Sequence, residues 1–304
     1  MSLYLDYRPP TLDEVIGNET IIPIIAKMTS NIKKCPHVFM LHGPTGCGKT
    51  TIGRIIKDRL GCKGADYREI SSNENRGIDT VREIIKNSSY LPLEGKTRVW
   101  LLDEVHKMTN DAQNAALKIF EDTPPHVYFI LCTTEPEKVI KAIRGRCSEF
   151  QVNPLTDLQM KGLLKSIVKA EGETLTKEVY EQIIQDSMGH ARNAIQTLEQ
   201  VLCVEPDKRL AAAMKVAELR SQTIELCRVL FKKSTWNDVR AILSNLQQQD
   251  AEEIRRAVLG YGKTILLKGD SPIAGLVMEC FLEPFYNSGF PGLIHACYTI
   301  IKSK

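Results

Sequence analysis

Near its start the chain reads Gly43-Pro44-Thr45-Gly46-Cys47-Gly48-Lys49-Thr50, which fits the pattern G-x-x-x-x-G-K-[ST] of a phosphate-binding loop. The apolar run 38–41 before the loop predicts a buried strand, and residues 49–60 predict a helix. A loop between a strand end and a helix N-terminus offers backbone N–H groups and the helix dipole to an anion. The stretch therefore predicts a nucleoside triphosphate site on an α/β domain.

Each residue type in this loop has a chemical reason to be there. Gly46 and Gly48 let the backbone curl around phosphates because they carry no Cβ atom. Lys49 is expected to reach the β- and γ-phosphates, and the Thr50 hydroxyl is expected to help hold Mg²⁺. We expect the whole loop, together with Thr51, to bind ATP.

Two further strands end in polar residues that suit the same site. The apolar run 98–102 leads into Asp103 and Glu104. Asp103 is placed to organise Mg²⁺ and its waters, and Glu104 to polarise the attacking water. The apolar run 127–132 ends in threonine hydroxyls, and a hydroxyl at such a strand end can sense the γ-phosphate.

Alternating strand and helix patterns predict that residues 1–153 form an α/β domain around a parallel sheet. The expected strands are 38–41, 67–71, 98–103 and 127–133, and the expected helices are 49–60, 78–88 and 109–121. From residue 154 the pattern is helical only. Thr156 and Gln159 predict a capping box at the start of a helix over 156–170.

The rest of the chain predicts helices separated by breaks. Residues 154–206 form a small helical lid domain with further helices over 175–187 and 190–203. Residues 207–304 form a C-terminal all-α domain. Its expected helices are 208–217, 221–232, 235–248, 250–267, 272–287 and 290–302.

Composition excludes several classes of protein. The 304 residues carry a net charge of +3, so nucleic-acid binding would require a local cluster of cations. No apolar run reaches the length of a membrane span, and the N-terminus lacks a secretory signal, so we expect no membrane partner. Nine cysteines without a C-x-x-C pair indicate a reducing cytoplasm. We expect buried thiols at Cys132, Cys203, Cys280 and Cys297.

Four more segments resemble one known family: 7–19, 103–108 (Asp-Glu-Val-His-Lys-Met), 143–150 and 189–195. Together they are similar to the AAA+ ATPases of sliding-clamp loaders. Residues 75–82 resemble the small subunits of replication factor C, whereas 114–118 and 133–136 resemble the gamma/tau subunit of bacterial DNA polymerase III. The resemblance covers residues 4–200 and is only architectural beyond them.

The resemblance implies roles for residues outside the phosphate loop. Arg146 matches the arginine finger that a subunit supplies in trans, although Gly145 replaces the family's serine. Arg144 also stands near enough to be the finger, and we favour Arg146. The resemblance further assigns the γ-phosphate sensor to Thr134 and the lid arginine that contacts nucleotide to Arg192. The segment expected to pack on adenine and ribose contains Tyr7, Arg8, Val15 and Ile16.

The implied function is that of an ATPase subunit in a pentameric ring. The ring would use ATP and Mg²⁺ to open a sliding clamp and load it on primer–template DNA, with the C-terminal helices as its collar. DNA should be held through its phosphates, because a clamp loader has no need to read sequence. The expected DNA contacts are Arg76, Arg82, Lys86 and Lys107, with Gln113 relaying DNA contact to the ATP site.

Some alternatives stay open at this point. Another AAA+ DNA motor, such as a branch-migration helicase, would use the same ATP motifs, and a non-catalytic stator subunit would keep only the scaffold. The bacterial relatives insert a four-cysteine module after the phosphate-loop helix, but residues 60–67 contain one cysteine, so we expect no zinc. The sequence leaves open whether the ring is homomeric or heteromeric. The mixed features suggest a phage-encoded protein acting in the host cytoplasm.

Overall fold

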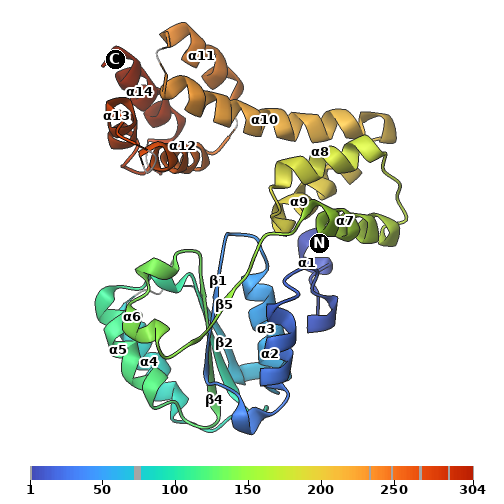
Figure 1. Ribbon diagram of the computed structural model, residues 1–304, viewed down its shortest axis with the longest axis vertical. Helices are drawn as coiled ribbons and strands as arrows, with labels where there is room; N and C mark the ends of the chain where they lie inside the picture. Colours follow the sequence, from blue (N-terminus) through green and yellow to red (C-terminus); the bar gives the residue numbers. More distant parts are fainter. Residues whose placement is uncertain are drawn as a thin grey trace. The chain divides into compact units, whose positions relative to one another are not determined.

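The four predicted strands and a fifth that was not predicted form one sheet (Figure 1). All pairings are parallel, and the strand order is β2-β3-β4-β1-β5. The strands are β1 (Val38–His42), β2 (Tyr67–Ser71), β3 (Arg98–Asp103), β4 (Val127–Thr133) and β5 (Ser148–Gln151). The computed structural model describes residues 2–71, 77–232, 234–247, 249–266, 269–286 and 288–303. The predicted α/β architecture with a parallel sheet is confirmed.

The strand β5 was missed because its sequence gives little signal. Ser-Glu-Phe-Gln is short and carries one apolar residue, Phe150, which is buried while Glu149 and Gln151 are exposed. Parallel pairing with β1 makes this segment an edge strand. A half-exposed edge strand of four residues lacks the continuous apolar run by which buried parallel strands are recognised.

Helices cover both faces of the sheet. One face carries α2 (Ile21–Thr29) and α3 (Lys49–Arg59), and the other carries α4 (Ile78–Ser88), α5 (Asn110–Glu121) and α6 (Lys141–Arg144) (Figure 1). The central strand β4 is buried along its whole length, as expected for a strand with helices on both sides.

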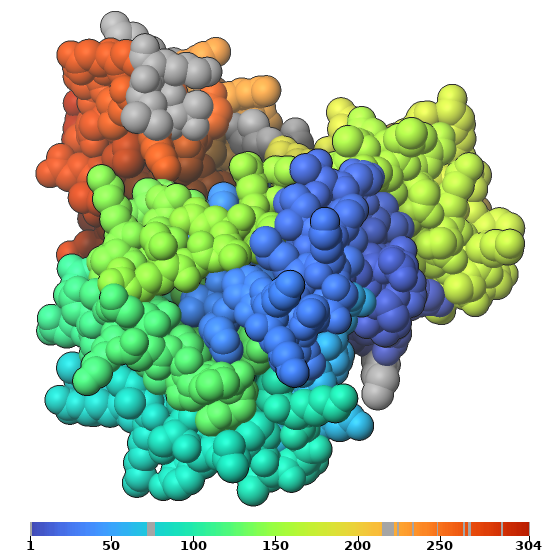
Figure 2. Space-filling model, turned by 60° about the horizontal axis from the view of Figure 1, so that its bottom comes forward, coloured from blue at the N-terminus to red at the C-terminus, as the bar shows by residue number. Residues whose placement is uncertain are grey.

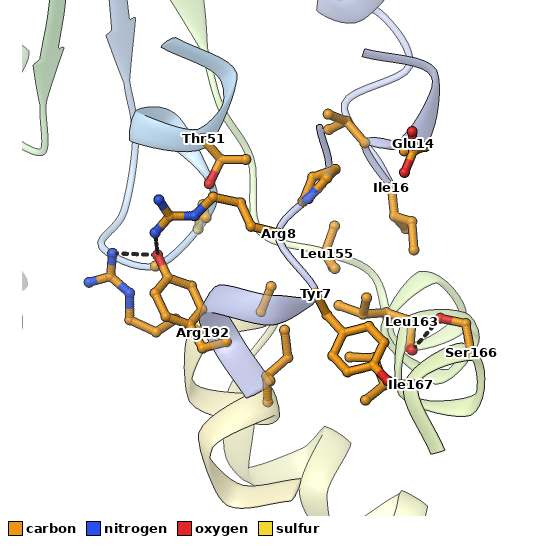
Figure 3. A pocket seen from close by; sticks show the side chains of 18 of the residues that line it. Tyr7, Arg8, Glu14, Ile16, Thr51, Leu155, Leu163, Ser166, Ile167 and Arg192 are labelled. Carbon is orange, nitrogen blue, oxygen red and sulfur yellow. Dashed lines mark hydrogen bonds between the residues drawn. The ribbon is translucent and has the colours of Figure 1, made fainter. Parts of the chain in front are cut away.

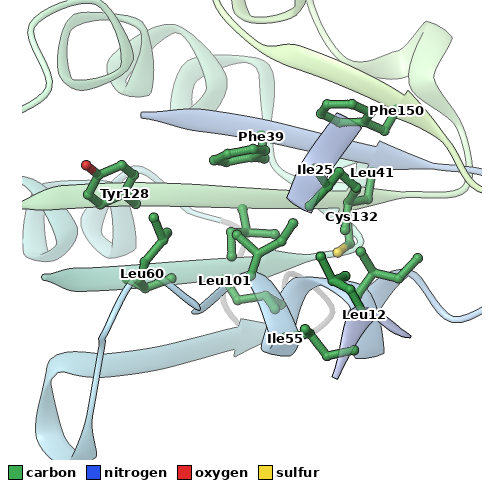
Figure 4. Packing of buried hydrophobic residues seen from close by; sticks show 14 of the residues in the cluster. Leu12, Ile25, Phe39, Leu41, Ile55, Leu60, Leu101, Tyr128, Cys132 and Phe150 are labelled. Atoms are coloured by element: carbon green, nitrogen blue, oxygen red, sulfur yellow. The ribbon is translucent and has the colours of Figure 1, made fainter. Parts of the chain in front are cut away.

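Alternate residues of β1, β3 and β4 enter two separate hydrophobic cores. Phe39, Leu41 and Leu101 pack with Ile25 and Ile55 on the α2–α3 side (Figure 4). On the opposite face the core contains Met40, Trp100, Leu102, Phe129, Ile84 and Phe120. The two cores hold the carboxyl ends of β1, β3 and β4 at one edge of the sheet, where parallel α/β proteins bind ligands.

The helices after the sheet form the second part of unit 1, which spans Met1–Pro206. They are α7 (Asp157–Ala170), α8 (Lys177–Ser187) and α9 (Ala191–Leu202). The predicted capping box is confirmed, because Thr156 accepts from the Gln159 backbone N–H and Gln159 accepts from the Thr156 backbone N–H.

The start of the chain is attached to these helices. The short helix α1 (Leu3–Asp6) contacts α9, and Figure 2 shows the dark-blue N-terminal segment beside the yellow-green helices. The Glu199 carboxylate of α9 accepts from the Ser2 hydroxyl at 2.9 Å and from the Leu3 backbone N–H at 3.3 Å. Glu199 therefore fixes α1, including Tyr4, relative to the first turn of α9.

Unit 2 spans Asp207–Lys304, and its described elements are all helical apart from the turns between them. They are α10 (Arg209–Leu230), α11 (Trp236–Asn245), α12 (Ala251–Leu266), α13 (Pro272–Cys280) and α14 (Gly289–Lys302). Their shared core includes Leu226, Leu230, Val258, Phe281 and Ile300.

Two helix predictions in unit 2 were wrong. The two helices expected over 208–217 and 221–232 are one helix, α10, because the segment contains no glycine or proline to end a helix between them. The helix expected over 272–287 ends at Cys280, since Pro284 disfavours helical backbone at the residue before it. Residue 287 lies outside the described residues.

The sequence also predicted the absence of a membrane-spanning helix and the burial of four thiols. Among the described residues, no helix is long and apolar enough to cross a bilayer. Cys132 and Cys297 are buried and Cys280 is partly buried, but Cys203 is exposed because it follows the last turn of α9. The buried thiol expected at Cys203 was therefore wrong.

Candidate nucleotide site

The phosphate loop connects β1 to α3 and depends on glycine at two points. A Cβ atom on Gly43 would lie 2.1 Å from the Val152 carbonyl oxygen, so only glycine fits there. Gly48, at the N-cap of α3, has a left-handed φ of 97°. These glycines let the loop curl back over the N-terminus of α3, where backbone N–H groups are available to an anion.

Lys49 is the buried cation of the loop. Its side chain donates from Nζ to the carbonyl oxygens of Gly43 and Pro44, each at 2.8 Å, and the residue is 6% exposed. Burial lowers the pKa of Lys49, against the opposing effect of nearby Glu104 and Asp103. The ammonium group is therefore held inside the curl of the loop, close to where the phosphates of a nucleotide would lie.

The acidic pair at the end of β3 faces the first turn of α3. The Thr50 hydroxyl donates to Asp103 Oδ2 at 3.2 Å. Burial and the neighbouring charge of Glu104 raise the pKa of Asp103. A hydroxyl and a carboxylate within contact of each other are the hard oxygen ligands that Mg²⁺ prefers, so Thr50 and Asp103 fit the ion predicted for them.

Glu104 has an unusual backbone, with φ of 54° and ψ of 42°. This left-handed region is uncommon for residues other than glycine and often marks a functional position. The Glu104 side chain bends toward β4, where the Thr134 hydroxyl donates to its Oε2 at 3.3 Å. The structure thus brings the predicted acid and the predicted sensor hydroxyl into contact.

A second contact to Glu104 comes from His106, to which the sequence assigned no role. His106 Nε2 lies 3.3 Å from Glu104 Oε2 and 3.3 Å from Glu135 Oε1. Its Nδ1 lies 3.0 Å from Thr133 Oγ1. The available signal was its place in the segment 103–108, but its partners at the end of β4 became visible only in the fold.

Arg192, in the first turn of α9, lies over the phosphate loop. Its backbone N–H donates to the Gly46 carbonyl oxygen at 3.4 Å. Its guanidinium donates to the Tyr4 hydroxyl oxygen at 3.0 Å, and Arg8 donates to the same oxygen at 3.1 Å (Figure 3). The Nε atoms of Arg8 and Arg192 are buried and have no partner within the described parts of the chain. Tyr4, which the sequence did not single out, is thus the meeting point of two predicted ligand-binding arginines.

Two adjoining cavities flank these residues. The smaller one, of about 60 Å³, is lined by Thr45, Gly46, Gly48, Lys49, Thr50, Thr51, Asp103, Glu104, Arg192 and Tyr4. The larger one, of about 440 Å³, lies between the N-terminal segment, the loop and the helices α7 and α9 (Figure 3). The predicted residues Tyr7, Arg8, Val15, Ile16 and Cys47 line it, together with the side chains of Leu155, Leu163 and Ile167. The pair of cavities suits a molecule with a flat apolar part and an anionic tail.

The two candidate finger arginines line neither of these cavities. Arg146 follows α6 and pairs with the exposed Glu121 at 3.0 Å, while also donating to the Ala142 carbonyl oxygen. Arg144 instead makes a bidentate pair with Glu149, at 3.1 and 3.0 Å. A bidentate arginine–carboxylate pair is stronger than a single ion pair. Moving Arg146 to a new anion would therefore cost less free energy than moving Arg144.

The structure describes three of the four predicted DNA-binding residues. Arg82 and Lys86 are exposed on α4, where Arg82 pairs with Asp79 at 2.8 Å. Lys107 is exposed in the turn after β3. Arg76 lies outside the described residues. Gln113 is buried and bonds the backbone at Met108, Lys138 and Ile140, so it links α5 to the segment before α6.

Known proteins to which this chain is similar in sequence include subunits of DNA polymerase III and of replication factor C. A family model described as DNA polymerase III, delta subunit matches residues 63–156. The DNA polymerase III subunit gamma/tau of Mycobacterium tuberculosis (strain CDC 1551 / Oshkosh) is 31% identical over 230 residues, covering 68% of this chain and 40% of that protein. Replication factor C subunit 3 of Blastobotrys adeninivorans is 35% identical over 199 residues, covering 64% of this chain and 58% of that protein. The chain thus spans about half the length of these relatives.

Solved structures show the same fold. The RuvB Holliday junction branch migration motor of Thermotoga maritima superposes with a TM-score of 0.62 at 19% identity, covering 87% of this chain and 99% of that one. At this identity the likeness concerns the fold alone. It supports the α/β fold around a parallel sheet that the alternating strands and helices predict.

Proposed function

We propose that this chain, which belongs to the AAA+ clamp-loader ATPases, hydrolyses ATP as one subunit of a ring that loads a sliding clamp on primer–template DNA. One observation carries the ATPase proposal. The phosphate loop, the end of β3 and the first turn of α9 line a single cavity, and the end of β4 contacts that lining through Thr134. A buried cation, a hydroxyl–carboxylate pair suited to Mg²⁺, a second carboxylate and an arginine line the same space, which supports the proposal.

Nucleotide binding is divided between the two cavities. The adenine and ribose enter the larger cavity beside Tyr7, Val15 and Ile16. The phosphates lie on the backbone of the loop, where Lys49 exchanges its carbonyl partners for β- and γ-phosphate oxygens. Arg192 leaves Tyr4 and contacts the phosphates from the lid.

Thr50 and Asp103 would hold Mg²⁺, which when bound neutralises charge on the phosphates. Glu104 orients the attacking water and accepts its proton. Thr134 holds one oxygen of Glu104 and lies at the strand end where it can respond to the γ-phosphate.

The site is completed by a neighbouring subunit. Arg146 lines neither cavity of its own chain and sits at the surface in an ion pair with Glu121. In the assembled ring it reaches the γ-phosphate bound to the next subunit and stabilises the charge that develops there. Unit 2 supplies the collar that holds neighbouring subunits together, and Arg82, Lys86 and Lys107 contact DNA phosphates.

ATP turnover tests this proposal. We expect slow hydrolysis by the chain with its ring partners, and faster hydrolysis when sliding clamp and primed DNA are added together. Lys49→Ala should lose turnover under every condition because the phosphates lose their buried cation. Turnover that is indifferent to clamp and DNA, with all partner subunits supplied, would falsify the clamp-loader assignment.

The same assay separates the alternatives. Stimulation by branched DNA without any clamp would indicate a branch-migration motor. ATP binding without turnover, in a ring that is active through its other subunits, would indicate a stator.

A further inference from the structure

His106 links the ends of β3 and β4 beside the proposed site of ATP hydrolysis. It lies in the turn η4 (Val105–Lys107) directly after β3, and its side chain is 3% exposed. Its ring reaches the end of β4, where it meets Thr133 on one side and Glu135 on the other. A buried polar ring in such a position has to be satisfied by hydrogen bonds.

The partners of the ring determine where its proton lies. Nε2 faces two carboxylates, Glu104 and Glu135, and a carboxylate can only accept, so Nε2 carries the hydrogen. Nδ1 then accepts from the Thr133 hydroxyl at 3.0 Å. The Thr133 oxygen in turn accepts from the Glu135 backbone N–H at 3.0 Å. Burial lowers the pKa of His106 against the charges of Glu104 and Glu135, which agrees with a neutral ring.

This network acts on one oxygen of Glu104. Both Thr134 and His106 reach Oε2, each at 3.3 Å. Within the residues that the structure describes, Oε1 accepts no bond, and Glu104 lines the phosphate cavity. The two donors therefore leave one oxygen of the carboxylate for water. Since the left-handed backbone of Glu104 is itself strained, the aim of this side chain depends on what holds it.

We propose that His106 is a positioning residue for ATP hydrolysis, whose neutral ring holds Glu104 Oε2 through Nε2–H and keeps Oε1 directed to the attacking water. Glu135 shares the same N–H, so it sets how strongly His106 holds Glu104. Its other oxygen pairs with Lys138 at 2.7 Å, which ties the network to the turn η5 (Pro136–Lys138) after β4. The inference rests on the proposed ATPase function.

The position of the His106 ring predicts that its loss affects ATP hydrolysis more than ATP binding. Of the network, only Glu104 lines either nucleotide cavity; His106, Thr133 and Glu135 line neither. Loss of His106 should therefore leave ATP affinity in place and misdirect the base. A misplacement of about 1 Å in a catalytic group can lower the rate by up to about 100-fold.

The test compares His106→Ala and His106→Gln in the assembled ring with clamp and primed DNA. His106→Ala should lower kcat by about 10- to 100-fold and change KM for ATP less than about twofold. His106→Gln should recover most of kcat, because its terminal amide can donate near the position of Nε2. A fluorescent ATP analogue measures binding directly.

His37→Ala is the matched control, since His37 lies before β1, away from the loop, and bonds the Val127 carbonyl oxygen at 2.7 Å. It should lower thermal stability without a selective loss of kcat. A kcat of His106→Ala within about twofold of wild type, or a His106→Gln variant no better than His106→Ala, would overturn the inference while the ATPase proposal stands. Absence of turnover in the wild-type ring would remove both.

Discussion

The buried carboxylate of Asp66 fixes the loop that precedes β3. Its carboxylate is fully buried and accepts from the backbone N–H groups of Leu93, Glu94 and Gly95, each at 2.8 Å. Arg98 adds an ion pair at 3.4 Å. Burial alone would raise the pKa of Asp66, but these donors outweigh it and the pKa lies below its ordinary value.

The first prediction follows from that pKa. Because the folded-state pKa is depressed, Asp66 contributes stability above its unfolded pKa of about 3.9 and loses it as pH falls through the folded value. Asp66→Asn should lower the free energy of unfolding at pH 7 by about 1–3 kcal/mol, since an amide cannot satisfy three converging donors. The variant should also lose less stability than wild type between pH 5 and pH 3, as urea titrations would show.

The exposed Asp122 provides the control for this change. Asp122→Asn should shift the free energy of unfolding by less than about 0.5 kcal/mol. An Asp66→Asn chain as stable as wild type at pH 7 would contradict the role given to these hydrogen bonds.

For single residues, the sequence predicts a place in the site when the residue belongs to a motif that is continuous in sequence. The phosphate loop and the pair Asp103–Glu104 follow their strands directly, so their places at the sheet edge could be predicted. Tyr4 and His106 could not be predicted as site residues, because Arg192 and Thr133, which complete their contacts, are distant from them in sequence. Tyr4 meets Arg192, 188 residues away, because α1 packs against α9, where Glu199 bonds Ser2 and Leu3.

Among the elements, α3 carries Lys49 and Thr50 of the candidate site and packs closely on the sheet at Gly53. A Cβ on Gly53 would lie 2.8 Å from Leu101 Cδ1 and 3.1 Å from Ile130 Cγ2. The absence of a side chain at Gly53 therefore sets the distance of α3, with Lys49 and Thr50, from the strands beneath it.

The second prediction concerns Gly53→Val. The added side chain should force α3 away from β3 and β4, at a cost of about 1–3 kcal/mol in the free energy of unfolding. ATP affinity should fall as well, because Lys49 and Thr50 move with the helix. Urea denaturation and titration with a fluorescent ATP analogue measure the two effects.

Gly162→Val in α7 is the matched control, since a Cβ there meets no atom within 4 Å. It should change the free energy of unfolding by less than about 0.5 kcal/mol and leave ATP affinity unaltered. Equal losses in the two variants would mean that the close packing of α3 has no special role.

The elements also show where sequence patterns stop being informative. Strands buried on both sides, such as β3 and β4, have continuous apolar runs and were predicted at their observed bounds. The edge strand β5 has one buried residue and becomes a strand only by pairing with β1. The length of α10 depends on the absence of breaking residues over 22 residues, a weaker signal than the presence of one.

At the scale of the whole molecule, we propose that a neighbouring subunit completes the ATP site. The chain has a net charge of +3, so the proposed contacts with DNA and neighbouring subunits would depend on local groups and not on overall charge. Arg146 is exposed at the surface and is the residue proposed to reach the neighbouring subunit. Arg146→Ala should bind ATP normally yet lower turnover by about a thousandfold. Arg144→Ala should keep most of its turnover, because Arg144 is committed to Glu149.

The most direct measurement is ATP turnover after mixing two inactive chains, with any other ring subunits, clamp and primed DNA present. In the proposed scheme, Arg146→Ala keeps the ATP site and lacks the arginine finger, whereas Lys49→Ala should lose ATP binding and keep the finger. Mixing them creates interfaces in which both halves are intact, so the account predicts that turnover returns. Turnover that stays at the level of the separate variants, while wild type diluted with Lys49→Ala remains active, would contradict it.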